Sequence, residues 1–456
     1  LRHTRTRFAR AVLRHHRRDP YRPRIWTRLM RRTISALATA IAVTVPVGLS
    51  AQSSWSDLTT LFSEWRDFER SDFVDGVPDY TPPAMARQQE ELRTWKDRLW
   101  AFDIDGWPVE QQIDWHLVRA EMNGLDFDHK IRRPWARDPA FYVMMYTSES
   151  DVPAHEGPVM HGWVDTWTYT YPLSSADAAE LAERFATIPS VLDQARANLA
   201  GSNARDLWHA GIRSFHGQAN DLRAYRAQVA GTSADLDRAL ERAAQASDDF
   251  AAWVVAELPG KTGLSGVGRE AYTWYMHNVH LSPFSWEEQV TLMRRELARA
   301  HASLRLEENR NRNIPQLERI GSAEEYDRRL TESVDRYMAF LERENVETVE
   351  EWMDAALRAS NGSFSPAAPG EIRNFFLEVI YRDPDAFRPH MHHWLELARK
   401  IEDPHPSPIR ATALLSNIYD HRSEGLATGV EEMFMHMGLL GENSPRAREL
   451  VWIMLA

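Results

Sequence analysis

Hydrophobic residues recur at helical spacing along most of this chain. The clearest stripe consists of Val290, Met293, Leu297 and Leu304. Residues spaced in this way share one face of an α-helix, and that face is usually buried. Ser285-x-x-Glu288 precedes the stripe in a capping-box pattern, which satisfies backbone donors at a helix start. The segment therefore predicts a helix with its apolar face in the core.

The same spacing recurs in other segments. One stripe consists of Tyr326, Leu330, Val334, Tyr337 and Leu341. Another consists of Leu236, Leu240, Phe250, Trp253, Val254 and Leu258. Pro259-Gly260 ends that second pattern, and Ser174-x-x-Asp177 begins one more predicted helix. No run of alternating strand residues interrupts them, so the chain is predicted to be all-α, with one large multi-helix domain.

Two stretches break the helical pattern. Residues 133–173 are rich in Trp, Tyr and Pro and predict a long irregular loop. The aromatic content predicts that this loop is ordered. Residues 360–371 contain Gly, Ser and Pro and predict a linker. We therefore divide the domain into a helical body, residues 52–360, and a histidine-rich helical part, residues 361–456. The last pattern, "RARELVWIMLA", has no stop signal, which indicates either a helix that docks into the core or a chain truncated after Ala456.

The first 51 residues have the features of a leader. Residues 1–32 hold 12 arginines and one aspartate, and residues 34–51 carry no charge and end in small side chains. A basic region, a short apolar region and a small-residue cleavage site predict a secretory signal peptide at about residues 30–51. A membrane anchor is the alternative, which Pro46 and Gly48 disfavour. The mature protein is therefore expected in the periplasm or outside the cell, without a stable membrane span.

Charge and cysteine content narrow the possible functions. The chain carries −12 overall and its first 32 residues carry +11, which leaves −23 for the rest. Such an acidic excess argues against a nucleic-acid partner. The absence of cysteine excludes disulfides, thiolate metal sites and cysteine nucleophiles. A bound metal would need His, Asp or Glu ligands, a set that suits zinc.

Six of the 18 histidines lie between residues 390 and 436: His390, His392, His393, His405, His421 and His436. Four His–Glu pairs have helical spacing, namely His392 with Glu396, His393 with Glu396, His421 with Glu424, and Glu432 with His436. Each pair could present a nitrogen and an oxygen to one ion, and a catalytic zinc needs three ligands and a water. The same spacing is typical of an ordinary helix ion pair. The sequence contains no HExxH, and its nearest match runs from His155 to His161.

Two motifs resemble a known family. "GVGREAYTWYMHNVHLSPFSWEEQVTLMRREL", residues 266–297, looks like the central helix-turn-helix of the domain-of-unknown-function 885 family, and "SEGLATGVEEMFMHMGLL", residues 423–440, resembles its late "EGWALYAE…LGL" helix. This family consists of exported bacterial all-helical proteins regarded as metallopeptidase-like. The resemblance covers most of the mature chain. The family pattern continues past the equivalent of residue 456, which favours truncation.

The resemblance also suggests site residues. Glu424 matches the family's late glutamate, a metal ligand there, and Pro389, His392 and His393 match half of its "HE..PGHH" motif with one residue inserted. The other half is missing, because Asp385 and Ala386 stand where the family has His-Glu. In a zinc peptidase that glutamate would take a proton from the metal-bound water.

Two functions follow as expectations. The first is an exported zinc-dependent hydrolase of peptide or related amide bonds. In it His392, His393 and Glu424 would bind the metal, Glu396 would activate water, and His421 or His405 would steady the oxyanion. The second is a non-catalytic helical protein that binds peptide-like or small ligands through its aromatic loop. The missing His-Glu favours the second function, whereas the dense imidazoles and the family ancestry favour the first.

Overall fold

The computed structural model describes residues 54–149, 160–366, 374–414, 416, 418–441 and 444–456, without the side chains of residues 418–422. The predicted signal peptide and residues 367–371 of the predicted linker lie outside this part of the chain. Within it the protein is all-α, as the sequence predicts. None of the described helices combines the length and the apolar character needed to cross a membrane.

The helices of eight or more residues are α2 (Trp55–Phe68), α3 (Pro82–Trp100), α4 (Val109–Phe127), α6 (Ser175–Ala186), α7 (Ile188–Leu199), α8 (Arg205–Gln228), α9 (Ala234–Glu257), α10 (Arg269–Asn278), α11 (Trp286–Arg310), α12 (Ala323–Glu344), α13 (Glu351–Ala359), α14 (Phe375–Arg382), α16 (His392–Glu402), α18 (Ile418–Met437) and α19 (Ala447–Leu455). The shorter helical turns are η1 (Asp128–Arg132), α5 (Pro134–Arg137), η2 (Pro139–Tyr142), η3 (Thr166–Thr168), η4 (Leu258–Gly260), α15 (Pro384–Phe387), η5 (Arg388–Met391) and α17 (Pro408–Ala411). Two small sheets accompany them, an antiparallel pair of β1 (Phe73–Val74) with β2 (Val77–Pro78) and a parallel pair of β3 (Met145–Tyr146) with β4 (Val164–Asp165).

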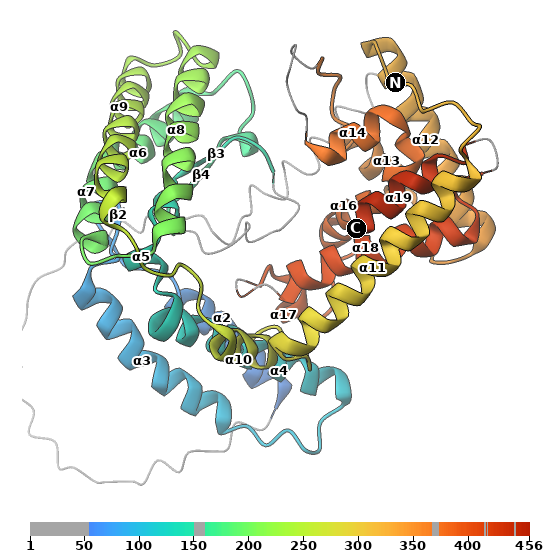
Figure 1. Cartoon of the computed structure of the whole chain (residues 1–456). Helices are drawn as coiled ribbons and strands as arrows, with labels where there is room; N and C mark the ends of the chain where they lie inside the picture. Colours follow the sequence, from blue (N-terminus) through green and yellow to red (C-terminus); the bar gives the residue numbers. More distant parts are fainter. Residues whose placement is uncertain (1–53, 150–159, 367–373, 415, 417, 442–443) are drawn as a thin grey trace, which may run out of the picture.

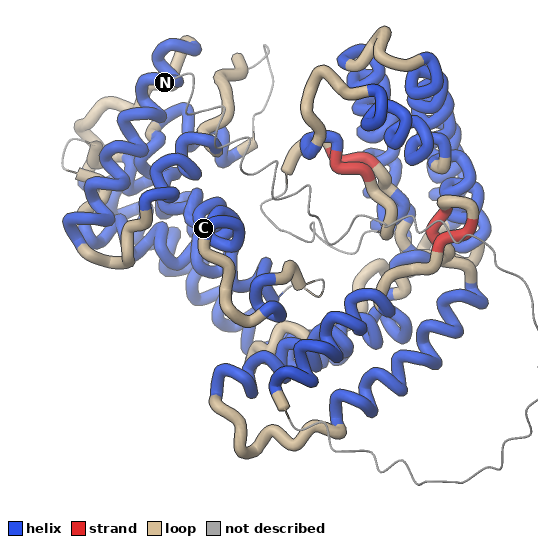
Figure 2. The backbone as a smooth tube through the Cα atoms, turned by 180° about the vertical axis from the view of Figure 1, so that it is seen from behind, coloured by secondary structure: helices blue, strands red, loops and turns tan. Residues whose placement is uncertain are grey.

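The helices form three groups (Figures 1 and 2). The first, which we call the bundle, packs α6, α7, α8 and α9 around one apolar cluster. The second, the base, packs α2, α3 and α4 around another. The third, the C-terminal unit, extends from α11 to α19 and surrounds a third cluster. Ala300 and Trp452 share this third cluster, so residues on both sides of position 360 pack together.

The predicted helix starts are confirmed. The Ser285 side chain accepts the backbone N–H of Glu288, and the Glu288 carboxylate accepts the N–H of Ser285, which completes the capping box of α11. The Ser174 side chain accepts the N–H of Asp177 at the start of α6. Local hydrogen-bonding chemistry therefore fixes these ends, as expected from residues only three positions apart.

The two predicted stripes of α11 and α12 have different outcomes. The α12 stripe is buried as predicted, with Val334 and Tyr337 fully enclosed. The α11 stripe is not a core face, because Met293 is 70% exposed and Leu297 is 43% exposed. Helix α11 lies along the outside of the C-terminal unit and approaches α19 through the small Ala300 (Figure 1). The predicted helix is therefore confirmed, but burial of its apolar face is not, because periodicity shows that a face is apolar but not which face meets a neighbour.

The aromatic region, residues 133–173, is irregular but well packed where the structure describes it. The Tyr142 hydroxyl donates to the Trp135 carbonyl at 2.6 Å, and the Met144 N–H donates to the Gln218 side chain at 2.6 Å. Tyr142 and Met144 belong to the core of the bundle. Aromatic packing therefore orders this region, as its composition predicts, while residues 150–159 lie outside the described part.

Residues 405–416, which we call the return segment, connect the C-terminal unit to the base. Ile409 and Leu414 pack into the apolar cluster of the base. Asp114 is almost completely buried. Its carboxylate accepts hydrogen bonds from the Arg410 side chain at 2.7 Å and from the Ser407 hydroxyl at 2.8 Å, which offset the cost of burying its charge. The Glu121 carboxylate accepts the Ser416 N–H at 3.0 Å. Two buried carboxylates of α4 therefore hold the return segment in place.

Candidate functional site

The predicted histidines lie where short turns lead into α16. Asp383 caps α15, because its side chain accepts the N–H groups of Asp385 and Ala386. Pro384 is the first residue of α15 and Pro389 the second of η5, and their fixed φ suits the first turn of a helix. These consecutive short turns place His390 in η5 and His392 and His393 in the first turn of α16. The segment packs against α18 and α13.

His392 is engaged on both ring nitrogens. Its Nδ1 lies 3.2 Å from the Tyr337 hydroxyl, and its Nε2 lies 3.3 Å from a Glu347 carboxylate oxygen. The side chain is almost completely buried, at 4% exposure. A metal would therefore have to displace one of these protein partners to reach a ring nitrogen.

The half-buried His390 and the buried Glu431 form a direct pair. The His390 Nδ1 lies 2.7 Å from the Glu431 carboxylate. The Phe376 ring stacks on His390 with a centroid distance of 4.6 Å, and the His393 ring meets it edge-on at 5.0 Å. Burial, reinforced by His390 and His392, lowers the pKa of His393 to about 3, so this imidazole stays neutral at neutral pH.

The remaining predicted site residues are dispersed. Glu396 is buried on α16, with Arg399 at 3.5 Å. His405 is exposed in the return segment, where its Nδ1 accepts the Ser407 N–H at 3.0 Å. Glu424 is half-buried on α18, and the side chain of His421 on the same helix is not among those described. The pair of Glu432 and His436 is a helix ion pair at 3.5 Å.

The predicted metal ligands can be compared with the arrangement of the described side chains. Among the residues that the structure describes, no three His, Asp or Glu side chains are grouped so that they could hold a metal ion. His392 and His393 are adjacent in the chain, but His392 is bound to Tyr337 and Glu347. The described side chains therefore do not fit the predicted metal centre, and zinc binding stays a prediction.

The positions that match the family's missing His-Glu have structural roles. Asp385 makes two hydrogen bonds to the Arg336 guanidinium, at 2.8 and 3.0 Å. Ala386 is completely buried in the apolar cluster of the C-terminal unit. A glutamate at position 386 would have to enter that cluster, so the site lacks the general base that the resemblance would require.

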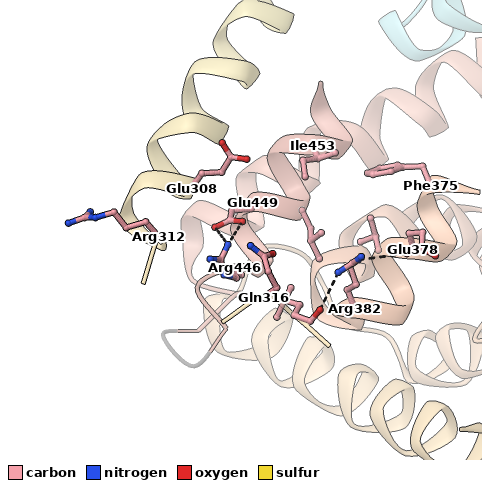
Figure 3. A pocket seen from close by; sticks show the side chains of 12 residues that line it. Glu308, Arg312, Gln316, Phe375, Glu378, Arg382, Arg446, Glu449 and Ile453 are labelled. Carbon is pink, nitrogen blue, oxygen red and sulfur yellow. Dashed lines mark hydrogen bonds and ion pairs between the residues drawn. The ribbon is translucent and has the colours of Figure 1, made fainter. Parts of the chain in front are cut away.

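A pocket of about 520 Å³ lies beside α14, the helix whose Phe376 stacks on His390. Helices α11, α14 and α19 and the segment after α11 surround it (Figure 3). Its lining contains charged and apolar side chains: Glu308, Arg312, Gln316, Leu317, Phe375, Glu378, Val379, Arg382, Arg446, Glu449, Leu450 and Ile453. The sequence analysis predicted none of these as site residues, because they come from three segments, each more than 50 positions from the next, and follow no spacing motif.

The base of the pocket is a compensated ion pair. Arg446 contacts both carboxylate oxygens of Glu449, at 2.9 and 3.0 Å, and also donates to the carbonyls of Asn311 and Ile314. Glu308 and Arg312 are exposed at one side of the pocket, whereas Phe375 and Ile453 provide exposed apolar surface at the other (Figure 3). A rigid base with charges of both signs and an apolar wall suits a small ligand that carries both charges.

Comparison with known proteins gives one family and one fold. The sequence model of a family described as bacterial protein of unknown function, DUF885, matches residues 67–375, more than half of the chain. No curated protein matches the sequence. A similar solved structure is that of a candidate lipoprotein of unknown function from Shewanella oneidensis, with 12% sequence identity and a TM-score of 0.57. The alignment covers 88% of this chain and 80% of that one. At this identity the likeness shows the fold alone, and the histidine-rich segment lies beyond the family match.

Proposed function

Because the chain belongs to the DUF885 family of bacterial proteins of unknown function, and carries a predicted signal peptide, we propose that it is an exported helical protein that binds peptide-like ligands without cleaving them. The ligand class follows from the pocket between α11, α14 and α19. The proposal assigns binding to this pocket and a structural role to the neighbouring histidines.

The pocket carries the proposal. A free amino acid or short peptide has an ammonium group, a carboxylate and an apolar side chain. Glu308 can attract the first group and Arg312 the second, since both are exposed at the pocket margin. Phe375 and Ile453 can cover the side chain. The Arg446–Glu449 pair supplies a preorganised base that needs no rearrangement on binding.

The surroundings of His392 support binding rather than hydrolysis. Tyr337 and Glu347 engage its two ring nitrogens, and the buried Ala386 stands at the position matched to the family's general base. Side chains that satisfy one another in this way stabilise the unit but leave no preorganised group to activate water.

A metal-dependent hydrolase of peptide or amide bonds is the second candidate function. The observation that favours it is the concentration of His390, His392 and His393 beside α18, the helix that carries Glu424. Zinc would supply a Lewis acid for attack on an amide carbonyl. This candidate requires the His392 side chain to leave its present partners.

Calorimetric titration of the full chain with dipeptides tests the proposal. We expect binding that falls about tenfold in Arg312→Ala and in Glu308→Ala, since each removes one charged contact. Arg305→Ala is the matched control, because Arg305 is exposed on α11 but does not line the pocket. Blocking the dipeptide termini should abolish the effect of both pocket variants.

Two results would reject the proposed function. One is the absence of dipeptide binding by folded protein. The other is zinc-dependent release of amino acids from the dipeptides, which would establish the hydrolase instead. A bound-metal assay on the same preparation separates the candidates, because the binding function does not need zinc whereas the hydrolase requires about one equivalent.

A further inference from the structure

A second pair of neighbouring histidine and glutamate side chains, His161 and Glu69, lies at the end of α2, outside the pocket. Glu69 follows α2 and is 7% exposed, and His161 belongs to the segment that leads into β4. The Glu69 Oε2 lies 3.9 Å from the His161 Nε2, which is longer than a hydrogen bond. The other oxygen, Oε1, is buried and accepts no hydrogen bond from any residue that the structure describes.

The tautomer of His161 follows from its neighbours. The backbone N–H of Ser71 donates to the His161 Nδ1 at 3.1 Å, so this nitrogen must be an acceptor. The Tyr80 hydroxyl lies 3.0 Å from the same nitrogen and accepts the His161 backbone N–H at 2.8 Å. The imidazole hydrogen therefore sits on Nε2, facing Glu69. Burial, with help from Arg70 and Arg66, lowers the pKa of His161 to about 3 and keeps the ring neutral.

The charges around Glu69 do not offset the effect of burial on its pKa. Arg66 and Arg70 favour an ionised carboxylate, but Glu121 on α4 disfavours it. Arg66 also interacts with Glu121 at 3.6 Å and donates to the Ala413 carbonyl at 3.1 Å. Burial dominates and raises the pKa of Glu69 to about 7.

We propose that Glu69 is a proton-controlled latch: residues 160–163 stay packed against the end of α2, through the contacts of His161 with Ser71 and Tyr80, while the Glu69 carboxyl is protonated, and they separate from α2 when this buried carboxyl ionises. An ionised carboxylate at this position would be buried with an unsatisfied oxygen. Opening of the segment gives that oxygen access to water. The direction follows from linkage: the closed form binds the proton more tightly than the open form, so rising pH favours opening.

The released residues belong to the aromatic region. Trp163 directly precedes β4, and its carbonyl accepts a hydrogen bond from Arg184 on α6. Opening would expose the Tyr80 hydroxyl and the His161 ring, which are now bonded to each other. The latch therefore regulates the surface between base and bundle and is independent of the pocket in the C-terminal unit.

Hydrogen exchange of the full chain tests the latch, with Glu69→Gln as the permanently uncharged form. Exchange rates corrected for intrinsic exchange give an equilibrium constant for opening of residues 160–163. The measured quantity is this constant in the native chain divided by the constant in the variant. Titration of His161 affects both proteins and cancels in this ratio. We expect the ratio to grow on the order of 50-fold between pH 5 and pH 8, from a pKa shift of about 2.5.

Glu91→Gln is the matched control, since Glu91 is exposed on α3, and it should reproduce the native exchange at every pH. A ratio that does not change with pH overturns the proposal. Infrared difference spectra give a second measurement. A protonated carboxyl band at pH 6, present in the native chain and lost in Glu69→Gln, supports the latch, and its absence from the native chain rejects it.

Discussion

Two pairs of this protein bring a half-buried histidine close to a buried glutamate, and they differ in the distance between the partners. His390 and Glu431 lie 2.7 Å apart and form a direct hydrogen bond. His161 and Glu69 lie 3.9 Å apart, and a phenol and a backbone amide satisfy the imidazole instead. The first pair holds two helices together, whereas the second leaves a carboxyl that prefers to keep its proton. The same two residue types therefore serve as a fixed contact in one unit and as a titrating contact in another.

The largest expected effect comes from breaking the direct pair. Glu431→Ala removes a buried carboxylate from the half-buried His390, and loss of one partner of a buried pair costs about 3–5 kcal/mol. Urea unfolding at pH 7 measures the change. Glu402→Ala, an exposed position on α16, should change the stability by less than about 0.5 kcal/mol. If Glu431→Ala behaves like this control, the direct pair is not a stabilising contact.

The second effect has the opposite sign. Glu69→Gln should stabilise the protein by about 3 kcal/mol at pH 8, because a pKa raised from 4.5 to about 7 in the folded state opposes ionisation. The native chain loses this stability as pH rises from about 4.5 to 7, so the two proteins should be equally stable at pH 4. Urea unfolding at both pH values provides the test. A stability gain that is equal at pH 4 and pH 8 would show that Glu69 does not titrate in this range.

The smallest effect concerns His393, whose ring meets the His390 ring edge-on. Its folded-state pKa of about 3 lies below the ordinary value of 6.5, so the unfolded chain binds the extra proton. Stability should therefore fall as pH drops from about 6.5 towards 3. His393→Phe should remove about 2 kcal/mol of this loss at pH 5. The exposed His405 is the control, and His405→Phe should retain the native acid sensitivity, as followed by thermal unfolding.

Local chemistry was predictable from the sequence, and long-range contacts were not. The caps at Ser285 and Ser174 depend on residues three positions away, and both are as predicted. The stripes on α11 and α12 are equally regular, but the α12 stripe is buried whereas Met293 and Leu297 of the α11 stripe are exposed. No local rule states which side of a helix will meet a neighbour, because the neighbour arrives from a distant part of the chain.

The candidate site shows the same division. The histidine cluster was visible in the sequence, but the partners of His392, Tyr337 and Glu347, lie 55 and 45 positions before it. Because of these partners, both ring nitrogens of His392 are already in contact with protein groups and are not free to bind a metal. The pocket beside it was not visible at all, because its walls come from three helices and only folding brings them together.

The return segment has a consequence for the order of folding. Ser407 donates to Asp114 across 293 positions, and Arg410 reaches the same carboxylate across 296. Helix α4 is thus synthesised long before the residues that pair with its buried Asp114. Contacts of such large sequence separation form slowly, since a long loop must close first. The base, which is synthesised early, therefore cannot complete its interior until the return segment has been synthesised and has docked.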